Sequence, residues 1–240
     1  MKIYKINKHY FDIIDTEDKA YWLGFLWCDG YVIKRDKYYN NCRKIEYNIK
    51  LSLSPQDENH LKKFKKCIDS NHPIHTYKCN GFSGIGETVE KRVFITNKHM
   101  GEMLQKKYQL IPHREKCEFV NEIPNSLKKH FIRGVLDADG SFCDYHTVDK
   151  GYNIYKINVQ FNTYERLLEF IEKYFYDIGL SNTKMYKKYK RHNGVNKDGY
   201  CRTLTYTGKI QATNILNHLY KDSTMYLDRK YKKYEDILNK

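Results

Sequence analysis

Two aspartates occupy equivalent places in a repeated sequence pattern. Asp29 and Asp139 each follow a glycine by five residues, Gly24 and Gly134, and each is followed directly by a further glycine. Two carboxylates that meet at helix C-termini repel each other, because unpaired carbonyls there add negative charge. A hard divalent cation such as Mg²⁺ relieves this repulsion, and metal-bound carboxylates are suited to phosphodiester hydrolysis. The pair therefore predicts metal-dependent chemistry on a phosphodiester.

An apolar helix is expected to carry each aspartate. The first helix should begin after a cap at Thr16 and stop at Gly30, and large apolar side chains cover most of its surface: Trp22, Leu23, Phe25 and Leu26. The simplest partner for such a helix is its second copy, with Gly24 and Gly134 allowing close backbone approach. A plain Asp-Gly turn after a buried helix would explain one copy alone. Two matched copies favour a paired site.

The segments that follow the two helices repeat as well. Residues 44–54 and 155–162 alternate polar and apolar side chains, as half-buried strands do. Further strands are expected at 73–79, 88–96, 184–192 and 200–207, and helices at 57–68, 98–107, 164–178 and 208–220. The pattern predicts an α+β fold with one αββαββα unit in residues 1–120 and another in 121–240. Residues 115–128 join them, and Asn125 or Ser126 should cap the next helix.

The charge of the chain indicates a polyanionic partner. The 240 residues hold 43 Lys+Arg against 29 Asp+Glu, a net charge of +14. Each half carries +7, from 22 basic and 15 acidic residues in 1–120 and 21 and 14 in 121–240. A hydrophobic content of 40% excludes a disordered basic tail, because such tails lack the groups that form a core. Each half should therefore offer its own basic surface.

Cysteines and apolar segments bear on the compartment. The seven cysteines include no C-x-x-C pair, so we expect reduced packing cysteines rather than disulfides or structural zinc. The uncharged run Ala20–Cys28 is too short to span a bilayer, and residues 1–10 lack the apolar core of a signal peptide. We expect a protein that is not secreted and has no membrane partner, in the cytoplasm or an organellar matrix with access to DNA.

At the two aspartates the sequence resembles a known family. Residues 22–30 (WLGFLWCDG) and 132–140 (IRGVLDADG) look like the two motifs of a single-chain LAGLIDADG homing endonuclease. The resemblance spans residues 15–234, and the first motif departs from it with Trp27 where the second has Asp137. It implies a pseudo-twofold duplication in which the motif helices form the interface. It also implies two antiparallel sheets that saddle the major groove of DNA.

The same resemblance implies the site residues. Asp29 and Asp139, with the backbone carbonyls of Cys28 and Ala138, would hold Mg²⁺, which Mn²⁺ or Ca²⁺ could replace in binding. The product would be a double-strand break with short 3′ overhangs. A basic residue late in each half would orient water or stabilise developing charge, and by position these are Lys116 and Lys230. A solvated surface lysine is the alternative for both, and Gln56 is a weaker candidate for positioning water.

Residue types on the strands indicate where bases could be read. Lysine suits guanine, asparagine and glutamine suit adenine, and glutamate suits cytosine. The polar faces of the two alternating strands supply these types: Lys44, Glu46, Asn48, Lys50 and Ser52, and Lys156, Asn158, Gln160 and Asn162. Other strands add basic residues suited to phosphates: Arg92, Lys187, Lys188, Lys190, Arg191 and Arg202. Strand pairs fit a major groove, so double-stranded DNA is the expected partner.

The sequence analysis leads to one hypothesis and keeps a second. The first is a monomeric, Mg²⁺-dependent, site-specific DNA endonuclease of intron homing, with a long, partly palindromic target because its halves differ. The second is a LAGLIDADG-type RNA maturase or a non-cleaving DNA-binding protein on the same scaffold. Single-strand or RNA binding through the 23 tyrosines is less favoured, since Tyr47, Tyr155 and Tyr174 fall on apolar phases.

Overall fold

The structure, a computed structural model, describes residues 4–39, 42–80, 87–111, 116–181 and 201–240. The first half contains α1 (Glu17–Asp29), β1 (Gly30–Tyr39), β2 (Cys42–Leu53), η1 (Pro55–Asp57), α2 (Glu58–Cys67), β3 (Ile74–Asn80), β4 (Glu87–Thr96), α3 (Lys98–Glu102) and the π-helix η3 (Met103–Lys107). After η4 (Glu118–Asn121), the second half contains α4 (Asn125–Asp139), β5 (Ser141–Asp149), β6 (Tyr152–Tyr164), α5 (Glu165–Asp177), β7 (Cys201–Thr207), α6 (Lys209–Tyr220) and α7 (Asp228–Leu238).

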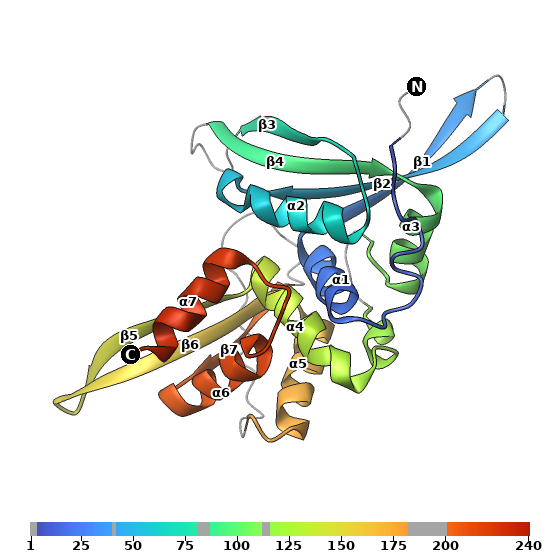
Figure 1. The fold of residues 1–240 in the computed structure, drawn as a ribbon. Helices are drawn as coiled ribbons and strands as arrows, with labels where there is room; N and C mark the ends of the chain where they lie inside the picture. Colours follow the sequence, from blue (N-terminus) through green and yellow to red (C-terminus); the bar gives the residue numbers. More distant parts are fainter. Residues whose placement is uncertain (1–3, 40–41, 81–86, 112–115, 182–200) are drawn as a thin grey trace.

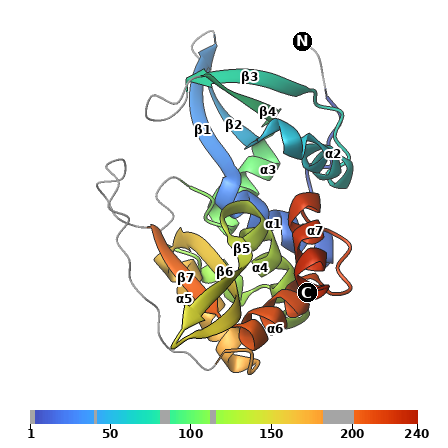
Figure 2. The same ribbon diagram turned by 90° about the vertical axis from the view of Figure 1, so that its left-hand side faces the viewer.

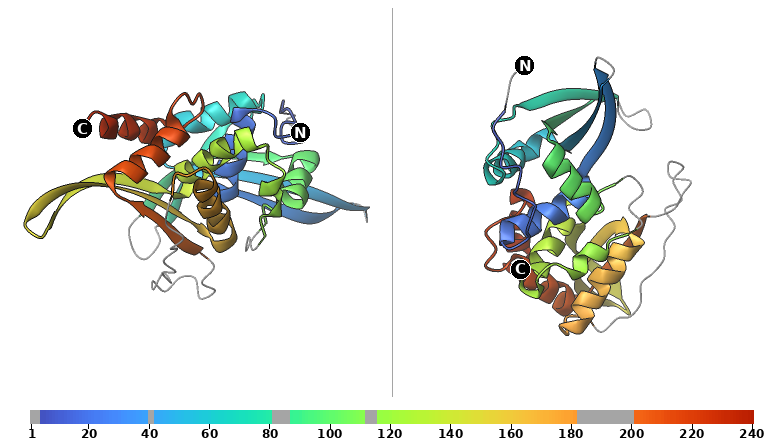
Figure 3. Two further views of the ribbon diagram at one scale, coloured as in Figure 1. Left: turned by 90° about the horizontal axis from the view of Figure 1, so that it is seen from below. Right: turned by 90° about the vertical axis from the view of Figure 1, so that its right-hand side faces the viewer.

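The strands form two separate antiparallel sheets, one in each half. Their described strands are ordered β1-β2-β4-β3 and β5-β6-β7. Figure 1 shows α1 and α4 in the middle of the molecule, with one sheet above them and the other below. Seen from below in Figure 3, the β1–β2 and β5–β6 hairpins extend toward opposite ends of the molecule. The expected α+β architecture is thus confirmed.

Strand register preserves the repeat to the residue. In the first hairpin Tyr31 pairs with Lys50, and in the second Ser141 pairs with Gln160. Both members of the second pair lie 110 residues after their counterparts, the same offset that separates Asp29 from Asp139. Equal offsets in a helix and in two paired strands are what a duplicated unit would retain.

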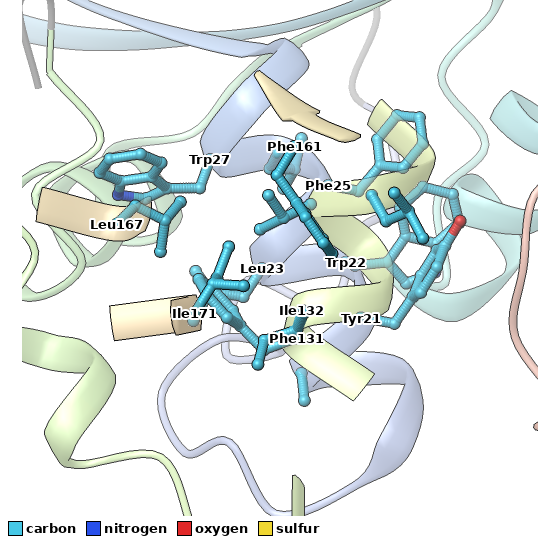
Figure 4. Packing of buried hydrophobic residues seen from close by; sticks show 14 of the residues in the cluster. Tyr21, Trp22, Leu23, Phe25, Trp27, Phe131, Ile132, Phe161, Leu167 and Ile171 are labelled. Carbon is cyan, nitrogen blue, oxygen red and sulfur yellow. The ribbon is translucent and has the colours of Figure 1, made fainter. Parts of the chain in front are cut away.

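The core is continuous across the two halves because α1 and α4 pack directly on each other. Every residue from Ala20 to Trp27 is buried, which agrees with an α1 surface that is apolar almost all round. Figure 4 shows Leu23 of α1 beside Phe131 and Ile132 of α4, with side chains from β6 and α5 around them. Such burial on all sides fixes both helices relative to their sheets.

The crossing of the two helices depends on the predicted glycines. A Cβ at Gly24 would lie 2.1 Å from the carbonyl oxygen of Phe131, and one at Gly134 would lie 2.1 Å from that of Tyr21. Both neighbours are backbone atoms, so no side-chain rotation could make room. The expectation that Gly24 and Gly134 allow close approach is confirmed.

Most of the predicted elements are present within three residues of their expected bounds, and three of the longer described elements have no predicted counterpart. These are β1 and β5, which directly follow the motif helices, and the C-terminal helix α7. The cap of α4 also differs, because Pro124 is the N-cap residue and makes no side-chain hydrogen bond. The strand expected at 184–192 lies outside the described residues.

Five described cysteines are free thiols, as expected: Cys28, Cys42, Cys67, Cys117 and Cys143. Only Cys117 is fully buried, and Cys42 and Cys143 are exposed, so packing does not explain all of them.

Within the described ranges, every helix is too short or too polar to cross a bilayer.

Candidate active site and nucleic-acid interface

The motif helices end at the two aspartates and turn straight into strands. At each C-cap the glycine N–H donates to the carbonyl four residues earlier, Gly30 to Leu26 and Gly140 to Leu136. Gly30 has an extended backbone rather than a left-handed turn, with φ −77°. A Cβ there would lie 2.4 Å from the Leu26 carbonyl oxygen, so only glycine fits this abrupt change. The aspartates are therefore held at a rigid junction.

Asp29 and Asp139 lie at the same end of the helix pair. Asp29 is half-buried and Asp139 exposed, and both carboxylates act electrostatically on one ammonium, that of Lys230. The side-chain amide of Asn162 on β6 donates to the backbone carbonyl of Asp139 at 3.3 Å. The structure thus brings together two carboxylates that are 110 residues apart in sequence.

Lys230 enters this site from the first turn of α7. Its Nζ donates to the backbone carbonyls of Leu136 (2.6 Å), Asp137 (2.8 Å) and Gly140 (2.7 Å). Burial lowers the pKa of this ammonium to about 8, although Asp137, Asp29 and Asp139 act in the opposite direction. The expected lysine is present at the site, but its three N–H groups hold the end of α4. This arrangement differs from the water-orienting contact anticipated from the sequence.

The donor set at the helix ends fits a hard divalent cation. It consists of two carboxylates, Asp29 and Asp139, and of main-chain oxygens at the negative ends of two helix dipoles. The carbonyl of Ala138 is not among the three that Lys230 takes. Asp29 and Asp139 both act to raise the pKa of the Lys230 ammonium, although burial outweighs them, so negative charge is present at the helix ends.

Asp137 has a structural role that its place in the motif did not reveal. It is buried between the halves and accepts hydrogen bonds from the Tyr21 hydroxyl (2.8 Å), the Tyr220 hydroxyl (2.5 Å) and the backbone N–H of Leu227 (2.8 Å). Burial raises its pKa even though these donors and Lys230 favour the charged form. At the equivalent place, the Trp27 indole donates to the Tyr108 carbonyl. Asp137 thus ties α1, α4 and α6 together.

The other two expected catalytic residues are exposed. Gln56 lies in η1, directly after β2, as expected. Lys116 precedes the buried Cys117 and acts electrostatically on the neighbouring Glu118. Neither makes a described contact with Asp29 or Asp139, so their catalytic roles remain predictions.

The outer face of the first sheet is polar and internally paired. Lys50 lies over the ring of Tyr31, and Arg92 donates to the Ser52 hydroxyl at 2.9 Å and stacks on Tyr77 at 4.0 Å. Glu46 is bound by Lys37 at 2.7 Å and by the exposed Lys44 at 3.7 Å. These side chains are held in place at the surface, where a groove-bound duplex could meet them.

The second sheet presents the corresponding polar row. Asn158 and Asn162 accept from the hydroxyls of Thr207 (3.0 Å) and Thr203 (2.7 Å) on β7. Gln160 accepts from Ser141 at 3.5 Å, and Lys156 pairs with Tyr145 across the hairpin. Asn48 and Thr96 form the equivalent pair in the first sheet at 2.8 Å. The threonine partners repeat between the halves and were not identified from the sequence.

Two expected DNA-contacting residues have little exposed surface. Asn48 is only 4% exposed and its amide oxygen already accepts from the Thr96 hydroxyl, so its contact with a base remains a prediction. Arg202 shares the phase of Leu204 and Tyr206 and so lies on the inner face, with its side chain 16% exposed and 3.9 Å from Glu165. The remaining four expected residues lie outside the described residues: Lys187, Lys188, Lys190 and Arg191.

Comparison with known proteins identifies the fold. No protein-family model and no curated protein matches the sequence. Among solved structures, the chain is similar to the LAGLIDADG homing endonuclease I-GzeII in complex with its DNA target, at 11% identity over 92% of this chain and 88% of that one, with a TM-score of 0.58. It is also similar to I-LtrWI bound to target DNA (13%; 97% and 90%; 0.57) and to meganuclease I-SmaMI bound to uncleaveable DNA (12%; 93% and 90%; 0.59). The chain has the fold of the single-chain, two-motif LAGLIDADG homing endonucleases.

Proposed function

We propose that this protein is a site-specific double-strand DNA endonuclease. The observation that carries the proposal is the pair of aspartates that end two closely packed helices, each beside a sheet with a polar outer face. A double-strand cut hydrolyses one phosphodiester on each strand, and two aspartates provide one carboxylate for each. The DNA named in the structures of I-GzeII and I-LtrWI supports a duplex as the substrate.

Asp29 and Asp139, with the carbonyls of Cys28 and Ala138, would hold the metal, proposed to be Mg²⁺. The bound metal would activate the attacking water and stabilise the leaving oxygen at each scissile phosphate. I-SmaMI has been solved with uncleaved DNA in the presence of calcium, which supports a divalent site with Mn²⁺ or Ca²⁺ as substitutes in binding. Lys230 would position Asp139 through the backbone carbonyls of Asp137 and Gly140, which lie on either side of it. Lys116 and Gln56, both from the first half, are proposed to act on water near the metal site.

Recognition would use the two outer sheet faces, one on each side of the cleavage site. Because residues 1–120 and 121–240 differ in sequence while sharing register, we propose a long target that is only partly palindromic and a monomer that binds it. The proposed contacts are Lys44, Glu46, Lys50, Ser52 and Arg92 from one sheet and Lys156, Asn158, Gln160 and Asn162 from the other. Short 3′ overhangs and a role in intron homing complete the proposal.

Cleavage of the DNA that flanks the reading frame, joined as an uninterrupted site in a supercoiled plasmid, tests the proposal. With Mg²⁺ the plasmid should become linear, and EDTA should prevent this. Asp29→Asn or Asp139→Asn should abolish cleavage or reduce it to nicking, whereas the control Asp177→Asn, on the exposed end of α5, should cut normally. Linear product from either active-site variant at the wild-type rate would disprove the metal assignment.

An RNA maturase or a non-cleaving DNA-binding protein is the second candidate, because the same scaffold and basic faces could serve either. Affinities for the duplex site and for the flanking intron RNA, measured at matched salt, separate the candidates. A preference for RNA, without plasmid cleavage in Mg²⁺, would favour the maturase.

A further inference from the structure

A second group of metal-ligating side chains lies in the first half, on the N-terminal segment and α3. His9, Asp12 and His99 each offer one ligand atom, and these atoms all lie within 4.8 Å of one another. His9 Nδ1 is 2.7 Å from one Asp12 carboxylate oxygen, and His99 Nε2 is 2.6 Å from the other. The two imidazole rings are 4.5 Å apart. We propose that these three residues bind a zinc ion or a similar divalent transition-metal ion.

Both elements that supply the ligands are anchored independently of any metal. The Tyr108 hydroxyl donates to the Phe11 carbonyl, and Lys107 Nζ donates to the Asp12 carbonyl, both at 2.8 Å. On the other element, the Asn97 side chain accepts from the Met100 N–H and so caps the helix that carries His99. Ligands on anchored backbone lose little conformational freedom on binding, which favours a preorganised site.

The ligand types select a different metal from the one proposed at the helix ends. Two imidazole nitrogens with one carboxylate suit zinc and its transition-metal neighbours, whereas Mg²⁺ prefers oxygen ligands alone. Tetrahedral ligands about 2.0–2.1 Å from zinc lie roughly 3.3 Å apart. The two histidines lie against different oxygens of Asp12, at 2.7 and 2.6 Å. An ion held by one of these oxygens would need the nearer histidine to move out by about 0.6–0.7 Å and the other histidine to turn toward the ion, which side-chain rotations could provide.

Solvent can complete the coordination sphere, because the site is open. The His9 side chain is 57% exposed and that of His99 39%. A cavity of about 360 Å³ adjoins His99 and is lined by Lys8, Asn97, Lys98 and Glu102. Lys8, Lys98 and Lys107 oppose a cation there and Glu102 favours one, so we expect moderate rather than very tight binding.

Calorimetric titration of the full chain with ZnCl₂ in excess Mg²⁺ tests the proposal. The Asp29→Asn/Asp139→Asn double variant is used as the background, so that zinc at the helix ends cannot contribute. We expect one zinc ion per chain, and a Co²⁺ complex with the visible absorption of a low-symmetry site. His99→Gln and Asp12→Asn should each weaken zinc binding at least as much as the roughly 10–100-fold loss that follows removal of a metal's second-shell partner.

His146→Gln, which removes an exposed histidine from β5, is the matched control and should bind zinc as the background does. Each variant is first checked, without metal, for a melting temperature within a few degrees of the background's. A variant that fails this check is compared with the background by Co²⁺ absorption alone. Zinc should raise the melting temperature of the background and of His146→Gln but not of His99→Gln. The proposal would be overturned if the background bound no stoichiometric zinc, or if His99→Gln and Asp12→Asn bound zinc as tightly as the background does. The three residues would then form only a hydrogen-bonded cluster. No DNA is used, so the result is independent of cleavage.

Discussion

Replacing Gly134 by alanine should destabilise the protein although alanine is the better helix former. The new Cβ would lie 2.1 Å from the Tyr21 carbonyl oxygen, 1.3 Å inside the 3.4 Å at which ordinary contact begins, and 2.9 Å from the Phe25 nitrogen. Overpacking costs about 1–3 kcal/mol and occasionally more, while Gly→Ala in a helix recovers about 1 kcal/mol. Because the clashing atoms are backbone, we take the upper end and expect a net loss of about 2 kcal/mol or more.

Urea unfolding followed by tryptophan fluorescence measures this directly, since Trp22 and Trp27 are both buried on α1 at the crossing. Gly24→Ala should lose a similar amount, because its Cβ meets the Phe131 carbonyl oxygen at the same 2.1 Å. Gly179→Ala is the control: nothing lies within 4 Å of its Cβ, and its φ of +73° should cost only about 1–2 kcal/mol of backbone strain. A larger residue should cost more than alanine at Gly134 but not at Gly179. A Gly134→Ala protein as stable as the wild type would refute the close-approach argument.

Three further predictions concern stability and binding. Burial lowers the pKa of His60 to about 3 and of His130 to about 4, below the ordinary 6.5, so the unfolded chain binds these protons first. The free energy of unfolding should fall as the pH drops from about 6.5 toward 4, by up to about 1.4 kcal/mol per pH unit for each histidine, and His60→Gln should flatten the slope in urea titrations at several pH values. Asp137→Asn leaves at least one buried donor without an acceptor, so a urea midpoint lower by the equivalent of about 1–3 kcal/mol is expected, and an unchanged midpoint would contradict the network. DNA affinity should fall steeply with salt, and Lys50→Ala or Lys156→Ala should reduce the slope of log K against log salt by about 0.9 if that lysine neutralises one phosphate; an unaltered slope would remove it from the interface.

The paired site could be predicted from the sequence because few alternatives satisfied the pattern. A helix that is apolar nearly all round must be buried, and a glycine at the same place in two such helices indicates a crossing. The placement of Asp29 and Asp139 then follows from their equal distance to Gly24 and Gly134. The strands with clear alternation, β2 and β6, were found for the same kind of reason.

Other features depend on tertiary contacts that no local pattern encodes. The partners of Lys230 are backbone carbonyls 90 to 94 residues away, at the last turn of α4 and its C-cap. Strand β1 mixes apolar, basic and aromatic residues without a sustained period, so it was not delimited. Arg202 is a different case, because its phase with Leu204 and Tyr206 already placed it on the apolar side of its strand. Composition alone had suggested a phosphate contact there.

The hydrogen bond between Tyr21 and Asp137 has a consequence for how the two halves can be recombined. At the 110-residue offset, Tyr21 corresponds to Phe131 and Asp137 corresponds to Trp27. A chimera built from two copies of the second half would face each buried carboxylate with a phenylalanine, which has no hydroxyl to donate. Engineers who exchange halves to alter target preference would therefore need to transplant this tyrosine with its aspartate. Through this one buried hydrogen bond the two halves are complementary to each other without being identical.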